Sequence, residues 1–379
     1  MSEKVPIVIV GGGVVGCAIA YKLGKEGTFV FEKGSYLGNE QSGRNSGVVH
    51  SGIYYDKNSL KSKLSIKGNK MITDFCSKYD VSYKNTGKLI VAKNPEEEKQ
   101  LETLLKNAET NSIAGVRIIK KDELKSIEPN VESNSALYVP SAGIIDASTY
   151  VDTLVKLSNN KNVEFLKHSK ITEINPDGDC FKIKVDYKDG SSDLFETELL
   201  INAAGLYSDE IAKIVNPESK YQINPIRGEY CKFNSKNKPH LDISHCIYPA
   251  PNIVEVNGEK SQSLGVHLTP TFGLDGISPV VLVGPTASNV DDKQNYEKNR
   301  LSESYFHEKI KDFFPNISLD DLSHDFTGIR AKLHNHDDFV IEIDKNHPNM
   351  INLIGIDSPG LTASLAIAEF VREMVIPRK

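Results

Sequence analysis

The chain has 379 residues, of which 39% are hydrophobic and 25% charged, so it is too long for one compact core and too apolar for a disordered protein. Its formal net charge of -6, from 45 basic and 51 acidic residues, argues against a nucleic-acid-binding protein. The five cysteines are widely spaced and contain no C-x-x-C pair, which argues against a disulfide scaffold and a metal site.

Nothing in the sequence predicts membrane insertion or export. No apolar run approaches the roughly 20 residues that a spanning helix needs. The first apolar run, 5–10, leads into a glycine turn instead of a signal-peptide cleavage site, and no Arg-rich presequence is seen. We therefore expect a cytoplasmic protein without a targeting segment, and we leave peripheral contact with a membrane open.

The first predicted elements form a β-α-β unit. Residues 5–10 are almost all β-branched and apolar, which is typical of a strand buried on both faces. A glycine turn at 11–16 leads into a helix that ends near Lys25, and residues 28–32 form a second strand. The segment 35–56 is rich in Gly, Ser and Asn, and a loop of this length is usually functional.

Periodicity and turn residues predict the remaining elements. We expect helices at 59–79, 96–109 and 150–157, after Gly205, and at 361–374. We expect strands at 88–92, 163–166, 171–174, 181–187, 194–201, 229–233, 264–268, 280–283, 339–343 and 351–354. The strands between 216 and 323 alternate with Pro/Gly/Asn-rich turns, which favours an antiparallel sheet. We predict a nucleotide domain from 1–85, 146–215 and 325–379, and a second domain from 86–145 and 216–324.

The strongest local motif is Gly11-x-Gly13-x-x-Gly16 between a strand and a helix. The glycines allow a tight turn, close approach of a pyrophosphate and close helix packing, and the helix N-terminus favours the phosphates. Glu32 follows about 20 positions after Gly11, where an acidic residue binds a ribose hydroxyl. The motif predicts a dinucleotide and disfavours NADP, but it leaves NAD and FAD open.

Two later turns favour FAD over NAD. Residues 202–205 (Asn-Ala-Ala-Gly) end a strand, and residues 355–362 form a glycine-containing strand-to-helix turn. Three such turns imply a ligand long enough to touch several parts of the sheet. The alternative is that the two later turns only serve packing.

The segment 42–55, SGRNSGVVHSGIYY, resembles the signature loop of the L-2-hydroxyglutarate dehydrogenases and oxidases, in the D-amino-acid oxidase-like flavoprotein superfamily. Further matching segments run in order at 86–92, 227–230, 248–251, 264–270, 328–331 and 355–362. The resemblance implies an α/β fold with a Rossmann-like FAD-binding domain of the glutathione-reductase type and an inserted antiparallel-sheet substrate domain. It also implies that L-2-hydroxyglutarate is oxidised to 2-oxoglutarate, with a quinone or oxygen as electron acceptor.

One segment departs from this family pattern. Residues 252–263 are longer and more polar than expected before the strand at 264, and we predict a surface hairpin insertion there. If this hairpin folds over the site, the choice of substrate is in doubt.

The resemblance implies a set of cofactor contacts along the chain. These residues are Gly11, Gly13, Val14, Val15, Gly16, Glu32, Lys33, Arg44, Asn45, Ser46, Gly47, Val48, His50, Ser51, Ile171, Ala203, Ala204, Gly205, Arg330, Gly360, Leu361 and Thr362.

Oxidation of a hydroxyl needs a base near working pH, which suits histidine. His267 is the first candidate and His50 the second, although each is also a common type of surface or turn histidine. An anionic substrate needs arginine, and we expect Arg330 to act in substrate binding and catalysis. The other substrate-binding candidates are Tyr54, Tyr55, Arg227 and Tyr248, with Lys332 as an assisting cation.

Two other functions stay open. A related flavoprotein would oxidise glycerol 3-phosphate, another 2-hydroxy acid or an amine. A nucleotide-binding sensor or assembly protein would have no turnover at all, and the gathering of His, Arg and Tyr around the expected flavin argues against it.

Overall fold

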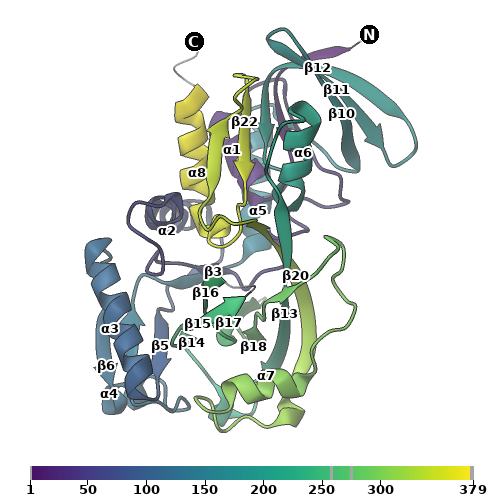
Figure 1. Ribbon diagram of the computed structural model, residues 1–379. Coiled ribbons are helices and arrows are strands. Elements are labelled where there is room, and N and C mark those ends of the chain that lie inside the picture. The colour runs from purple at the N-terminus through teal and green to yellow at the C-terminus, as the bar shows by residue number, and fades with distance from the viewer. Residues whose placement is uncertain (1, 257–258, 274–275, 376–379) are drawn as a thin grey trace.

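The described strands form two large sheets and two small ones, and the large sheets lie one above the other in Figure 1. The computed structural model describes residues 2–256, 259–273 and 276–375, and for 252–256 and 259–263 it describes the backbone alone. No helix in these ranges is long and apolar enough to cross a membrane.

The upper sheet has a parallel centre. Four strands run parallel in the order β12, β1, β2 and β9. The C-terminal end of β12 also pairs in parallel with β22. The sheet continues from β12 as an antiparallel meander through β11 to β10. Its strands are β1 (Glu3–Val10), β2 (Thr28–Phe31), β9 (Glu164–Leu166), β10 (Ser169–Asp177), β11 (Cys180–Tyr187), β12 (Ser192–Asn202), β21 (Val340–Ile343) and β22 (Met350–Ile354).

Helices cover both faces of this sheet. α1 (Val14–Leu23), α2 (Leu60–Tyr79), α5 (Ala147–Asn159) and α8 (Gly360–Val375) share one apolar core with Ile9. α6 (Ser208–Val215), which follows η1 (Gly205–Tyr207), packs in a second core with Val8 and Val10. Neighbouring residues of β1 therefore face different cores, and the prediction of a strand buried on both faces is confirmed.

The lower sheet is mainly antiparallel. Its order is β19-β13-β18-β17-β14-β5-β7-β6, with β20 paired to β13 and a single parallel pair of β14 with β5. The strands are β5 (Lys88–Ala92), β6 (Arg117–Lys120), β7 (Ser135–Val139), β13 (Ile223–Asn234), β14 (Cys246–Pro249), β17 (His267–Gly273), β18 (Gly276–Gly284), β19 (Ser288–Asn289) and β20 (Ser323–Leu333).

Shorter elements surround the lower sheet. They are α3 (Pro95–Thr110), α4 (Lys121–Ile127), α7 (Glu303–Ile310), η2 (Pro239–Leu241) and η3 (Leu319–Asp321). β3 (Val48–Val49), β8 (Gly143–Ile145) and β4 (Tyr83–Lys84) form a small sheet. β15 (Asn252–Val256) and β16 (Glu259–Ser263) pair as a hairpin, as the polar segment 252–263 predicts.

Two local predictions need correction. The predicted strand at 264–268 is wrong in its first half, because Gly265 takes a φ of +67° and interrupts the extended backbone, so β17 begins at His267. The predicted loop at 35–56 contains the short strand β3. The predicted boundary between the two domains, at residues 324 and 325, falls within β20. The division into two domains therefore stays a prediction.

Candidate active site

A cavity of about 2330 Å³ lies between the two large sheets and is lined by residues from both. Small-molecule pockets usually hold about 300–1,000 Å³, so this cavity has room for a dinucleotide together with a second, smaller ligand. Its walls include the glycine turn after β1, the segment 38–50 and the start of β17.

The glycine turn has the geometry that a pyrophosphate requires. Gly11 takes a φ of +102°, and a Cβ there would lie 2.5 Å from the carbonyl oxygen of Ala203. A Cβ on Gly16 would lie 2.0 Å from the carbonyl oxygen of Gly11, so helix α1 packs directly on the turn. Gly13 caps α1 without a side-chain bond, and Gly13, Val14 and Val15 line the cavity, so the helix N-terminus borders it.

Glu32 follows β2 and closes this end of the cavity. Its Oε2 accepts a hydrogen bond from the Gly12 N–H at 2.9 Å, and its Oε1 accepts one from the Gly34 N–H at 2.6 Å. Each carboxylate oxygen has a second acceptor site, so Glu32 can still receive a ribose hydroxyl. Beside it, the Lys33 ammonium lies 3.2 Å from the centroid of the Tyr207 ring.

The loop at 42–50 is held by its own polar side chains. Ser42 Oγ accepts from the Val14 N–H at 2.9 Å, and Asn45 Oδ1 accepts from the Gly47 N–H at 2.8 Å. Gly47 takes a φ of +68°, where a Cβ would lie 2.6 Å from a carbonyl oxygen of Ile145. These contacts fix the course of the loop, and most of its residues line the cavity.

His50 is held in place through its backbone. Its N–H donates to Thr362 Oγ1 of α8 at 2.9 Å, and its carbonyl accepts from Asn69 Nδ2 at 3.0 Å. Its Nε2 lies 3.4 Å from Ser358 Oγ, and its Nδ1 is buried without a partner among the described residues. Burial holds the pKa of His50 well below its usual range, and the charge of Lys88 lowers it further.

His267 is buried, with 5% of its surface exposed, and stacks on the Tyr248 ring at 3.7 Å between centroids. Its Nδ1 lies 3.1 Å from the carbonyl oxygen of Gly265. Because a carbonyl only accepts, we assign the proton to Nδ1, and Nε2 keeps its lone pair. Burial lowers the pKa of His267 to about 3, and nearby cations lower it as well, so the imidazole is a neutral base at neutral pH.

Arg330 projects from β20 into the cavity wall and is half-buried. In the described ranges its guanidinium has no hydrogen-bond or ion-pair partner. Its positive charge lowers the pKa values of both His50 and His267, so the three side chains lie close enough to interact electrostatically.

Three tyrosines complete this end of the cavity. Tyr54, Tyr55 and Tyr248 line it, and burial raises the pKa of each hydroxyl, so they are hydrogen-bond donors at neutral pH. The Tyr54 hydroxyl has no partner among the described residues.

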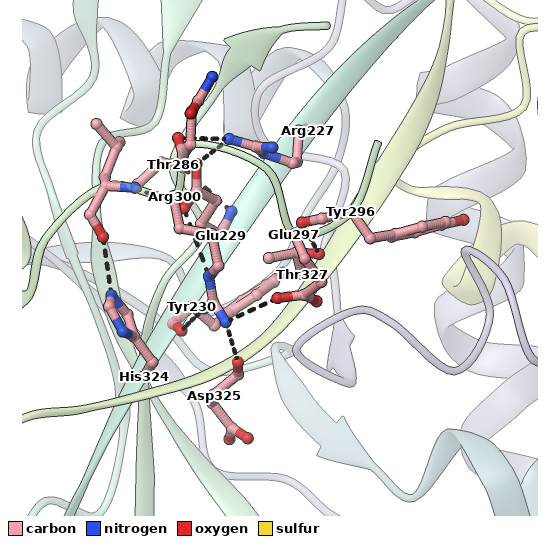
Figure 2. A network of polar contacts seen from close by, with 12 residues as sticks. Arg227, Glu229, Tyr230, Thr286, Tyr296, Glu297, Arg300, His324, Asp325 and Thr327 are labelled. Atoms are coloured by element: carbon pink, nitrogen blue, oxygen red, sulfur yellow. Dashed lines mark hydrogen bonds and ion pairs between the residues drawn. The ribbon is translucent and has the colours of Figure 1, made fainter. Parts of the chain in front are cut away.

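The structure does not bring Arg227 to the cavity. Its side chain is buried in the network shown in Figure 2, where it donates to Glu229 at 2.9 Å and to the carbonyl of Lys298 at 2.6 Å. Arg300 lies on the other side of Glu229, with its Nε at 3.7 Å from Oε2. Because its donors serve Glu229 and loop carbonyls, we remove Arg227 from the proposed substrate-binding set.

Most of the predicted cofactor contacts lie at the cavity wall. The exceptions are Gly16, Gly47, Ser51 and Thr362, which stand behind the wall and shape it. The described lining includes Gly11, Gly13, Val14, Val15, Glu32, Lys33, Arg44, Asn45, Ser46, Val48, His50, Ile171, Ala203, Ala204, Gly205, Arg330, Gly360 and Leu361.

Two groups at the site were not predicted from the sequence. Lys61 and Asp357 form a buried ion pair of 2.8 Å at the cavity wall. Lys88 is fully buried with its ammonium 4.0 Å from the Tyr248 ring centroid. The sequence feature that could have pointed to Lys88 is a lysine at the start of the otherwise apolar strand Lys88–Ala92.

A glycine turn that borders a large cavity, together with two neutral histidines and an arginine that has no side-chain partner among the described residues, defines a dinucleotide-binding oxidoreductase. The model of the FAD dependent oxidoreductase (DAO) family matches residues 6–374, and the chain belongs to this family. FAD is therefore its cofactor, and the upper sheet is its Rossmann-like FAD-binding sheet.

Individual relatives match over most of the chain. L-2-hydroxyglutarate dehydrogenase of Caenorhabditis elegans is 31% identical, covering 99% of this chain and 94% of the relative. Glycerol 3-phosphate dehydrogenase of Caloramator mitchellensis is 28% identical, and the match covers 97% of this chain and 73% of the relative. The solved structure of L-alpha-glycerophosphate oxidase from Mycoplasma pneumoniae with FAD bound has a TM-score of 0.87 at 28% identity, covering 99% and 95%.

Proposed function

We propose that this FAD-dependent enzyme oxidises L-2-hydroxyglutarate to 2-oxoglutarate. The observation that carries the proposal is the Arg330 guanidinium, which faces the cavity without a hydrogen-bond or ion-pair partner among the described residues and lies near two neutral imidazoles. A guanidinium binds a carboxylate through two parallel hydrogen bonds. In a 2-hydroxy acid the reacting carbon is bonded to that carboxylate, so the same contact brings the hydroxyl toward the histidines. The C. elegans relative supports this substrate.

The residues have separate roles in this reaction. FAD, when bound, would supply the hydride acceptor for C2 of the substrate. His267 Nε2 accepts the hydroxyl proton, so the C–H and O–H bonds break as the C=O bond forms. His50, held by Thr362 and Asn69, is the second candidate for this proton.

Tyrosine hydroxyls supply further contacts to the substrate. Tyr54, Tyr55 and Tyr248 line the same end of the cavity, and we propose that they donate to the carboxylate oxygens. Lys332 also reaches the wall, but its ammonium is paired with Asp337. A contact from Lys332 to the substrate therefore requires exchange of that ion pair.

Glycerol 3-phosphate is the second candidate substrate. The Caloramator and Mycoplasma proteins favour it by their names and by their similarity over most of this chain. An arginine that binds a carboxylate also binds a phosphate, so Arg330 alone does not separate the two substrates.

Anaerobic flavin reduction tests the proposal. Purified holoenzyme is mixed with L-2-hydroxyglutarate, its D-enantiomer, L-lactate, glycerol 3-phosphate and glycine, and the visible flavin band is followed. Bleaching by L-2-hydroxyglutarate alone supports the proposal. Bleaching by glycerol 3-phosphate or glycine, with none by L-2-hydroxyglutarate, refutes L-2-hydroxyglutarate as the substrate. The protein would still be an FAD-dependent oxidoreductase.

An electron acceptor completes the catalytic cycle. We propose oxygen or a membrane quinone, and oxygen consumption measured with and without a soluble quinone analogue separates them. A quinone acceptor would bring a cytoplasmic enzyme into peripheral contact with a membrane, and co-sedimentation with lipid vesicles tests that contact.

A further inference from the structure

Lys88 is a buried cation that the proposed reaction does not use. It begins β5 and has no exposed surface, and its Nζ has no hydrogen-bond partner among the described residues. In the same ranges no carboxylate forms an ion pair with it. Lysine is almost never fully buried without a partner, because removing an ammonium from water is costly.

Packing alone does not account for this lysine. Its neighbours along β5 are apolar and buried, and β5 lies between β7 and β14 in the lower sheet. A methionine of similar length would fill the same space without the desolvation cost. A residue kept at a cost to stability indicates a role in function.

The Lys88 ammonium is in contact with aromatic rings. Its Nζ lies 4.0 Å from the centroid of Tyr248 and 5.2 Å from that of Tyr54. Tyr248 stacks on His267 with an angle of 14° between the ring planes. Lys88, Tyr248 and His267 therefore form a chain of contacts that ends at the proposed base.

We propose that Lys88 is a positioning residue that acts through Tyr248 to hold the His267 imidazole in the orientation that accepts the substrate proton. Cation–π attraction fixes the Tyr248 ring, and the fixed ring supports His267 by stacking. Lys88 does not line the cavity, so it acts on the proton acceptor without binding substrate. The role of His267 in this inference rests on the proposed function.

The charge of Lys88 acts in the same direction. It lowers the pKa values of His50 and His267, which keeps both imidazoles neutral. Burial lowers the pKa of Lys88 itself to about 8, so the cation is lost as the pH rises through that value. Among the described residues, the titratable or charged groups that face this cluster are Tyr54, Tyr55, Tyr230, Tyr248, Cys246, His50, His267 and Arg330.

The first test is Lys88→Met in the holoenzyme, with whichever compound bleaches the wild-type flavin. We expect the limiting rate of flavin reduction to fall about tenfold with little change in substrate Kd, from loss of a desolvated cation–π contact. We also expect a higher denaturation midpoint, because an unpaired buried charge is removed. A purely structural role predicts the opposite pair of results, a less stable protein with an unchanged rate, and that pair would overturn the proposal.

A double-mutant cycle tests the path through Tyr248. In a Tyr248→Leu background, Lys88→Met should have no further effect on the reduction rate, because the intermediate ring is gone. If the rate losses of the two substitutions add in the double variant, the proposed action through Tyr248 is overturned. Lys88→Arg should recover most of the rate and, unlike the wild type, keep it above pH 8. Lys120→Met, on the exposed edge strand β6, is the control and leaves both rate and stability unchanged.

A readout without turnover separates this inference from the proposed function. Nitrogen-15 spectra of histidine-labelled holoenzyme should show a single Nδ1–H tautomer for His267 in the wild type and in Lys88→Arg, and exchange between tautomers in Lys88→Met. An unchanged single tautomer in Lys88→Met overturns the positioning role. Failure of L-2-hydroxyglutarate to bleach the flavin refutes only the substrate.

Discussion

Replacement of Arg330 by methionine tests the proposed carboxylate contact. Because the guanidinium has no partner among the described residues, the substitution breaks no hydrogen bond or ion pair there, and we expect the free energy of unfolding to change by less than about 0.5 kcal/mol. Each hydrogen bond to a charged group contributes about 1.5–3 kcal/mol. Loss of two such bonds at about the lower value removes roughly 3–4 kcal/mol, which raises the Kd for substrate by about 100- to 1000-fold.

The assay is stopped-flow reduction of the flavin under anaerobic conditions over a range of substrate concentrations, which separates Kd from the limiting rate. Arg117→Met, on the exposed strand β6, is the matched control and keeps the wild-type Kd. An unchanged Kd in Arg330→Met, or a loss of stability above about 2 kcal/mol, refutes the contact and assigns the arginine a structural role.

Four further predictions follow from the geometry. His267→Gln should retain FAD but lose about 100- to 10,000-fold in reduction rate, measured by the same stopped-flow assay; an unchanged rate removes His267 from the mechanism. Gly11→Ala should lose FAD, seen as a lower ratio of visible to ultraviolet absorbance, since its Cβ would lie 2.5 Å from the Ala203 oxygen; full flavin content would contradict this. Arg227→Met should lower the free energy of unfolding by about 3–5 kcal/mol, measured with denaturant, because it leaves Glu229 buried with one charge partner fewer. An unchanged free energy would contradict a stabilising role for this ion pair. The native state should lose stability as the pH falls below about 6.5, because the unfolded chain protonates His267 and the native protein, with a pKa of about 3, does not; this loss should be smaller in His267→Gln.

The turn at the first glycines could be predicted because its determinants are local. Gly11, Gly13 and Gly16 have fixed spacing between a buried strand and a helix, and the structure shows a positive φ at Gly11 and close packing at Gly11 and Gly16. The strand at 88–92 was predicted at its correct bounds for a similar reason, since a short apolar run between turns leaves few alternatives.

Residues whose role depends on distant partners could not be assigned in this way. Arg227 and Arg330 both lie within two residues of a glycine, Gly228 and Gly328, and only the tertiary structure shows that Arg227 is bound to Glu229 while Arg330 faces the cavity. The bend at Gly265 was missed because alternation of apolar residues continues through it, although the backbone does not stay extended. Lys88 was missed because its contact with Tyr248 joins strands that are far apart in sequence.

The bond from the His50 N–H to Thr362 Oγ1 joins the loop after the first β-α-β unit to the last helix. Helix α8 also packs against α1 in the core beneath the glycine turn. A ribosome must therefore synthesise nearly the whole chain before the flavin pocket has its final walls. A chain that ends before α8 would lack part of the pocket wall, however well its glycine turn has formed.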